Sequence, residues 1–196
     1  MKLTEKKRKN IIEAAIEEFR EQGFLGANTT RIAKRAGVSS RTLYNHFESK
    51  EELFKAISQI MIERNTAMKP VAYNPDQPLN QQLVDALERY VAVITEAEVM
   101  GLNRMVISEL LRDLERSRAF FAEMVTHDYP ITQLIKDAME AGALRPAEPE
   151  YAASQLLGLV KNFFFWPEFL LGEKLASEGV MQDCVAMFLS HYKTDS

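Results

Sequence analysis

The chain has little of the chemistry that stabilises secreted proteins or anchors membrane proteins. Its 196 residues include one cysteine, Cys184, which excludes an intramolecular disulfide framework and is typical of a reducing compartment. No apolar run approaches the roughly 20 residues needed to cross a bilayer, and the charged N-terminus lacks a signal-peptide pattern. We therefore expect a cytoplasmic protein that does not enter the membrane.

The patterns expected of enzymes and metalloproteins are also missing. The three histidines, His46, His127 and His191, have no spacing that would place two metal ligands on one helix face. There is no glycine-rich phosphate loop and no serine nucleophile elbow. Cys184 has apolar neighbours, where a thiol more often packs than reacts. We expect no catalytic activity, no metal and no cofactor.

The charge is distributed unevenly along the chain. Residues 1–56 contain 12 Lys/Arg and 8 Asp/Glu, a net charge of +4, whereas residues 57–196 contain 12 and 20, a net charge of −8. A basic head on an acidic body indicates that only the head meets a polyanion. We expect two domains, a head at 1–56 and a larger body at 57–196.

The spacing of apolar residues predicts an all-α protein. Strand-like alternation is absent, and most glycines and prolines fall between helical stretches. The predicted helices cover about 4–22, 29–36, 40–46, 49–68, 79–96, 98–112, 114–126, 130–142, 149–165 and 177–193, with a break at 167–172. The first three helices form a compact N-terminal group, and the others form a C-terminal helical bundle.

The second and third predicted helices have a helix-turn-helix pattern. A tight turn, Ala36-Gly37-Val38-Ser39, separates them, and Asn28 and Ser39 are suited to cap them. Leu43 and Phe47, four residues apart, are expected to face inward. The other side chains of the third helix are short hydrogen-bonding groups, an arginine and a tyrosine, which suit groove edges and phosphates. Judged by spacing alone, a helical hairpin with a solvated polar face explains the pattern equally well.

A longer stretch resembles the DNA-binding domain of the TetR family of repressors. It runs from Thr29-Thr30-Arg31-Ile32-Ala33-Lys34-Arg35 through the turn, and continues with Arg41-Thr42-Leu43-Tyr44-Asn45-His46-Phe47 and Ser49-Lys50-Glu51-Glu52-Leu53. The resemblance covers residues 10–55. It implies a helix-turn-helix domain that binds a double-stranded DNA operator, in a protein that acts as a homodimer.

The resemblance implies a role for each matching position. Residues at the start of the second helix would grip a phosphate, those at the start of the third would face the major groove, and Arg41 is the best candidate for guanine. Asn28 stands where the family usually has Thr or Ser, and it keeps the ability to cap. The predicted DNA-binding residues are Asn28, Thr29, Thr30, Ser39, Ser40, Arg41, Thr42, Tyr44, Asn45, His46 and Lys50. A basic arm adds general attraction, or is simply a solvated helix face: Lys2, Lys6, Lys7, Arg8 and Lys9.

The predicted helix at 149–165 carries apolar residues on more than one side, and the helix at 177–193 has an apolar side with further apolar residues beside it. A helix of this kind needs a second partner besides its own core. In TetR-like proteins the last two long helices pair with their copies in a four-helix bundle, so we expect a homodimer through these helices. A monomer with a large core is the alternative.

The body also contains methionines and aromatic residues that can line an apolar pocket. The candidate lining is Tyr90, Met105, Phe120, Phe121, Met124, Phe163 and Trp166, although a filled core would use the same residues. The run Phe165-Trp166-Pro167 resembles the C-terminal domain of the AefR-like subgroup. We therefore expect a transcriptional regulator, a repressor released from a palindromic operator by a small, mainly apolar inducer. A DNA-binding architectural protein without a ligand is the alternative, and the sequence does not identify the inducer.

Overall fold

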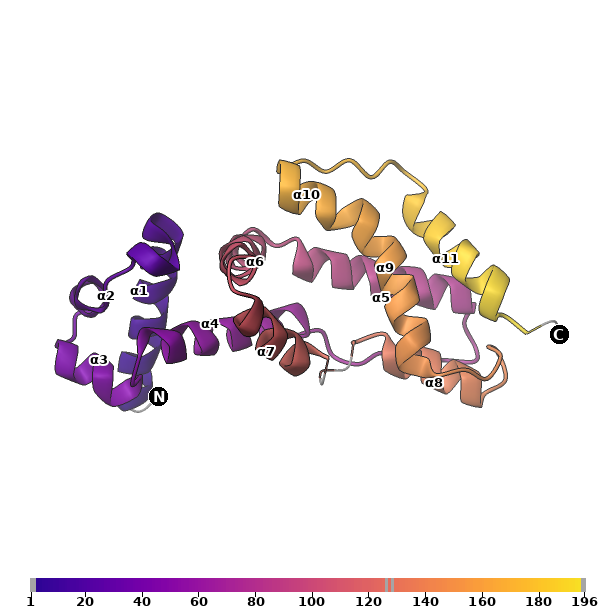
Figure 1. Cartoon of the computed structure of the whole chain (residues 1–196). Coiled ribbons are helices and arrows are strands. Elements are labelled where there is room, and N and C mark those ends of the chain that lie inside the picture. The colour runs from indigo at the N-terminus through magenta and orange to yellow at the C-terminus, as the bar shows by residue number, and fades with distance from the viewer. Residues whose placement is uncertain (1–2, 126, 128, 195–196) are drawn as a thin grey trace. The chain divides into compact units, whose positions relative to one another are not determined.

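The computed structural model describes residues 3–125, 127 and 129–194 (Figure 1). Over these residues the chain is helical, apart from loops and one isolated bridge between Leu144 and Lys193. The helices are α1 (Leu3–Gly26), α2 (Thr29–Arg35), α3 (Ser40–His46), α4 (Lys50–Asn65), α5 (Leu79–Ile94), α6 (Ala97–Leu110), α7 (Leu114–Met124), α8 (Thr132–Glu140), α9 (Pro149–Phe164), α10 (Trp166–Leu171) and α11 (Val180–Tyr192). Within the described ranges, no helix is long and apolar enough to span a bilayer. The predicted all-α class is confirmed.

Packing divides the chain into two compact units. The first contains the residues up to 63 together with 101–124, and the second contains 64–100 and the residues from 125 onward. The first unit therefore includes most of α6 and all of α7, which follow α5 in sequence. The functional boundary expected at residue 56 stays a prediction, because packing alone defines these units.

The core of the first unit is built around three phenylalanines. The ring centroids of Phe19 and Phe24 lie 5.5 Å apart, and the ring of Phe54 lies 6.1 Å from Phe19 and 5.3 Å from Phe24. Leu43 and Phe47 are fully buried in the same core, as the sequence predicted. These contacts hold α1, α3 and α4 together, so the outer face of α3 belongs to a packed unit rather than to a free helix.

The predicted helix caps form as expected. Asn28 Oδ1 accepts a hydrogen bond from Thr30 N at 2.8 Å, and Ser39 Oγ accepts one from Thr42 N at 3.1 Å. Each bond satisfies a backbone donor that would otherwise have no partner in the first turn of its helix. α2 and α3 therefore begin at the residues that the cap chemistry indicated.

The second unit buries α5, α8, α9 and α11 around a common core (Figure 1). α9 presents Leu156, Leu157 and Val160 to this core, while Tyr151 and Phe163 remain exposed. The expectation that this helix is apolar on more than one side is confirmed.

The break predicted at 167–172 is wrong, because α10 covers most of it. Pro167 lies in the first turn of α10. Backbone N–H groups in the first turn have no intrahelical partner, so the lack of an N–H in proline costs no hydrogen bond there. Gly172 ends the helix with φ of 76°. The proline predicted to mark a break is thus part of a helix start.

Gly23 interrupts α1 with φ of 68°, and a Cβ atom placed there would lie 3.3 Å from a carboxylate oxygen of Glu109. We expect Gly23→Ala to lower the free energy of unfolding by about 1–2 kcal/mol, because a side chain is strained at this φ. Urea denaturation of the full chain measures the change. Gly26→Ala is the control, since its Cβ would meet only Gln22 Cβ at 3.6 Å. Equal losses in both variants would contradict the strain argument.

Candidate nucleic-acid interface

The outer face of α3 is polar and lies over a buried apolar pair. Ser39 caps the helix, while Leu43 and Phe47 are fixed in the core. Ser40, Arg41 and Asn45 consequently point away from the core and are exposed. The structure therefore places three of the predicted base-facing residues together on one side of a rigid helix.

The predicted set also contains residues that are less accessible. Thr42 is half-buried, and its hydroxyl lies 2.9 Å from Ser39 Oγ, so both hydroxyl groups already have a protein partner. His46 is half-buried at the last turn of α3. Ser39 and Thr42 thus have a clear structural role in starting α3, and their contacts to DNA stay predictions.

The start of α2 and the middle of α3 are joined by a hydroxyl contact. Thr29 Oγ1 lies 3.0 Å from the hydroxyl of Tyr44, which is 48% exposed. Asn28 and Thr30 beside them are exposed as well. This brings the predicted contacts of two helices to one place, and the hydroxyl that accepts in this pair keeps its own proton to donate to a phosphate group.

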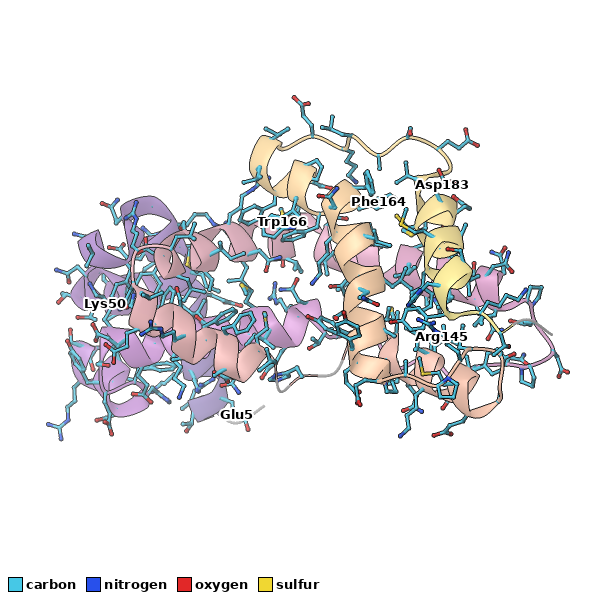
Figure 2. All side chains as sticks on the ribbon, turned by 45° about the vertical axis from the view of Figure 1, so that its right-hand side comes forward. Glu5, Lys50, Arg145, Phe164, Trp166 and Asp183 are labelled. Carbon is cyan, nitrogen blue, oxygen red and sulfur yellow. The ribbon has the colours of Figure 1, made fainter. Side chains whose placement is uncertain are left out.

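Lys50, labelled in Figure 2, lies at the start of α4 and is directed to the end of α1. Its ammonium group donates to the carbonyl oxygens of Phe24 at 2.7 Å and Ala27 at 3.2 Å, with a longer contact of 3.4 Å to Leu25. It also lies 4.6 Å from the centre of the Phe24 ring. The sequence reading missed this role, and a phosphate contact by Lys50 stays a prediction that requires it to exchange one of these partners.

The basic arm is partly engaged within the protein. The guanidinium of Arg8 lies 5.0 Å from the ring centre of Phe47, and Lys9 pairs with Glu13 at 3.6 Å. Lys6 is exposed and Lys7 is half-buried, while Lys2 lies outside the described residues. Arg8 therefore contributes to the attachment of α1 to α3.

Sequence reasoning missed a buried carboxylate that joins α2 to α1. Glu18 on α1 is 1% exposed, and its Oε1 accepts hydrogen bonds from Asn28 N at 3.2 Å and Arg31 Nε at 2.6 Å. A buried charge is tolerated when it is paired and hydrogen-bonded, as it is here. Glu18 therefore fixes both the start and the middle of α2.

A second, exposed set of contacts, made by Arg35, lies beside it. Arg35 donates to both carboxylate oxygens of Glu21, at 2.8 and 2.7 Å, and to Glu17 at 3.2 Å. The hydrogen bond from Arg35 lowers the pKa of Glu21. The sequence contains the signal for this network, because Glu17 and Glu21 on one helix and Arg31 and Arg35 on the other are each four residues apart.

Two positive charges on α2 and α3 take no part in this network. Among the described residues, the cations of α2 and α3 without an acidic partner are Lys34 and Arg41, both exposed. Lys34 was not among the predicted DNA-binding residues, although it lies on α2 with them. The basic character of this face therefore comes from Lys34 and Arg41 rather than from all its arginines.

The seven candidate ligand-lining residues do not lie in one unit. Met105 is buried in the first unit, with Phe120 and Met124 half-buried and Phe121 60% exposed. Tyr90 is buried in the second unit, whereas Phe163 and Trp166 are 42% and 43% exposed. Trp166, labelled in Figure 2, packs against Phe165 and Phe169 at α10. Neither unit by itself brings the whole set together, and the lining stays a prediction.

Comparison with known proteins gives a consistent result over both units. Residues 11–57 match the family described as bacterial regulatory proteins, tetR family, and residues 81–194 match the C-terminal domain of AefR-like transcriptional repressors. The HTH-type transcriptional regulator YhgD of Bacillus subtilis (strain 168) is 26% identical over 82% of this chain and 84% of its own length.

Two solved structures are similar over almost the whole chain. A TetR family transcriptional regulator from Pseudomonas syringae pv. tomato str. DC3000 is 33% identical, with a TM-score of 0.79, covering 97% of this chain and 98% of that protein. The flavonoid-responsive regulator FrrA is 27% identical, with a TM-score of 0.76 and the same coverage.

Glu18→Gln tests the buried contact. We expect it to lower the free energy of unfolding by about 1–3 kcal/mol, because the charge of Arg31 loses its buried partner. Glu17→Gln, at a carboxylate that is 60% exposed, should change it by less than about 1 kcal/mol. Urea denaturation of both full-length variants makes the comparison, and a Glu18→Gln protein as stable as Glu17→Gln would refute the anchoring role.

Proposed function

Since the chain belongs to the TetR family of bacterial regulatory proteins, we propose that it is a repressor that binds a palindromic operator as a homodimer and is released by a small molecule. The observation that carries the DNA-binding half is the outer face of α3. There the side chains of Ser40, Arg41 and Asn45 have no hydrogen-bond partner among the described residues, while the helix below them is capped and packed.

We assign sequence readout to the residues of α3. The planar fork of Arg41 matches the O6 and N7 acceptors of guanine in the major groove. The Asn45 side chain can pair with adenine or donate to the DNA backbone. The Ser40 hydroxyl can contact donor or acceptor groups on the base edges. These groups read sequence because they lie on a helix whose orientation is fixed by Leu43 and Phe47.

We propose that phosphate contacts position the protein on the duplex. The hydroxyls of Thr29 and Tyr44 lie together, with Asn28 and Thr30 beside them, and Lys34 adds an exposed positive charge on the same helix. Contacts of this kind set the register of the protein but carry no sequence information. We expect their loss to weaken binding to all duplexes alike.

Dimerisation is assigned to α9 and α11. A mainly apolar groove between these helices is lined by residues that include Leu159, Phe163, Met187 and Phe188, together with the polar Gln155, Asn162 and His191, and Met187 is 62% exposed. An exposed apolar groove on a monomer is suited to a self-complementary two-fold contact. Two recognition helices related by such an axis require half-sites about 34–36 Å apart.

We propose that the body binds the inducer. The relative FrrA is described as flavonoid-responsive, which makes flavonoid-like aromatic compounds the first to test. An inducer lowers operator affinity only by as much as its affinities for the free and DNA-bound forms differ. A compound that binds the protein and leaves operator binding unchanged is therefore not the inducer.

The DNA-binding half is tested first. The operator is obtained by selecting bound duplexes from a random pool, and we expect an inverted repeat. Arg41→Ala should then weaken binding to this operator by about 1–3 kcal/mol and leave binding to random duplex nearly unchanged, because a base contact is lost. Fluorescence anisotropy measures both affinities. Equal losses on the two duplexes would reduce Arg41 to a phosphate contact.

The dimer interface is tested with Met187→Glu. A carboxylate in an apolar interface is costly, so we expect the dimer dissociation constant to rise about tenfold or more and operator affinity to fall with it. Gln182→Glu places the same charge on an exposed position of α11 in a different groove and should leave the dimer intact. Sedimentation velocity distinguishes the species. A dimeric Met187→Glu protein would refute the assignment of this groove.

A further inference from the structure

Lys161 is a half-buried positive charge in the second unit. It lies on α9 between two tyrosines, with its ammonium nitrogen 5.8 Å from the ring centre of Tyr90 and 5.2 Å from that of Tyr129. Among the described residues, no carboxylate pairs with it and no acceptor hydrogen-bonds to it. Desolvation lowers the pKa of this ammonium group, as is expected of a cation removed from water.

The hydroxyl groups of the two tyrosines are also without partners. Tyr90 is 2% exposed, and burial raises its pKa, with a smaller contribution from Tyr129 nearby. Neither hydroxyl has a hydrogen bond within the described part of the chain. Tyr192 in the same unit, by contrast, donates to Gln155 Oε1 at 2.6 Å. Buried phenols normally find a partner of this kind.

These groups are not sealed away from accessible space. Over the described residues, one side-chain polar atom is both fully buried and unpartnered, and it is Thr132 Oγ1 rather than the hydroxyl of Tyr90. Thr132 shares a turn with Tyr129, since Thr132 N donates to Tyr129 O at 2.9 Å. The unpartnered hydroxyl of Thr132 and the unused donors of Lys161, Tyr90 and Tyr129 therefore occur in one part of the second unit.

The composition of this cluster selects a type of ligand. Aromatic ring faces attract an ammonium group but accept none of its three hydrogen bonds in the way an oxygen does. Lys161, Tyr90 and Tyr129 together offer several donors and no strong acceptor. Anionic oxygen groups are the acceptors that suit such donors, and charge-assisted hydrogen bonds of this kind are about twice as strong as neutral ones.

We propose that Lys161, Tyr90 and Tyr129 form a carboxylate-binding subsite, so that the inducer is an apolar molecule with one acid group. The proposal rests on the ligand-sensing function proposed above and specifies the ligand class for it. The acid oxygens receive hydrogen bonds from the ammonium and the two phenols. The apolar part of the ligand lies against the surrounding side chains of the body.

Paired probes test the subsite. Octanoate, 3-phenylpropanoate and 4-phenylbutanoate are each compared with the primary amide of the same skeleton, which keeps shape and removes charge. Isothermal titration calorimetry of the full-length protein should show at least one acid binding about tenfold or more tightly than its amide. Lys161→Met should abolish this preference and leave the affinity for the amide within about twofold. Lys174→Met, at an exposed lysine, should change neither affinity.

A measurement without ligand provides a second test. Because Lys161 is a desolvated cation with no acidic partner among the described residues, Lys161→Met should raise the melting temperature of the free protein. The Lys174→Met variant should melt like the parent. A lower melting temperature for Lys161→Met would show that the lysine has a structural partner, and would overturn the proposal.

The remaining outcomes separate this subsite from the sensing function. If acids bind no more tightly than amides, or if Lys161→Met keeps the preference, the subsite is refuted. If neutral compounds nevertheless release the operator, the proposed ligand sensing stands without the subsite. If no probe of either kind binds, the subsite is refuted, and ligand sensing is overturned only if the flavonoid-like compounds also fail to bind while the dimer still holds its operator.

Discussion

The carboxylate of Glu18 is buried between α1 and α2, and the placement of the DNA-reading helices depends on it. It accepts hydrogen bonds from the backbone of Asn28, which caps α2, and from Arg31 one turn further on. Any shift of α2 along α1 would leave a charge buried without its partner, which is strongly destabilising. α3 follows α2 after a four-residue turn, so the same contact also limits the orientation of the face that carries Arg41.

A second set of contacts holds the end of α1 against α4 and α7. Phe24 has the ammonium of Lys50 at 4.6 Å and the guanidinium of Arg116 at 4.2 Å from its ring centre. Lys50 in addition donates to the carbonyl oxygens that follow Gly23, where α1 is interrupted. The first unit thus attaches α7 to α1 and α4 through contacts of Arg116 with the rings of Phe24 and Phe54, beside the apolar packing of Phe120 against the same core.

Most local features could be predicted from the sequence, whereas most long-range polar contacts could not. The caps at Asn28 and Ser39 and the burial of Leu43 and Phe47 depend on neighbours in sequence, and all four predictions are confirmed. Glu18 and Lys50 act on residues 10 to 26 positions away, which no periodicity reveals. The error at α10 has a different cause, since a proline stops a helix in its interior but starts one in its first turn.

Residues 101–124 pack with the first unit, although residues 64–100 before them belong to the second. This arrangement has a consequence for protein engineering. A sensor with a new specificity is often made by fusing the DNA reader of one regulator to the body of another. A junction placed after residue 56 of this chain would separate the reader from Leu102, Met105, Val106 and Leu110, which are buried in its core. The hybrid would then expose apolar surface on the reader itself. Transplantation therefore has to carry α6 and α7 along with the helix-turn-helix, or redesign the surface that they cover.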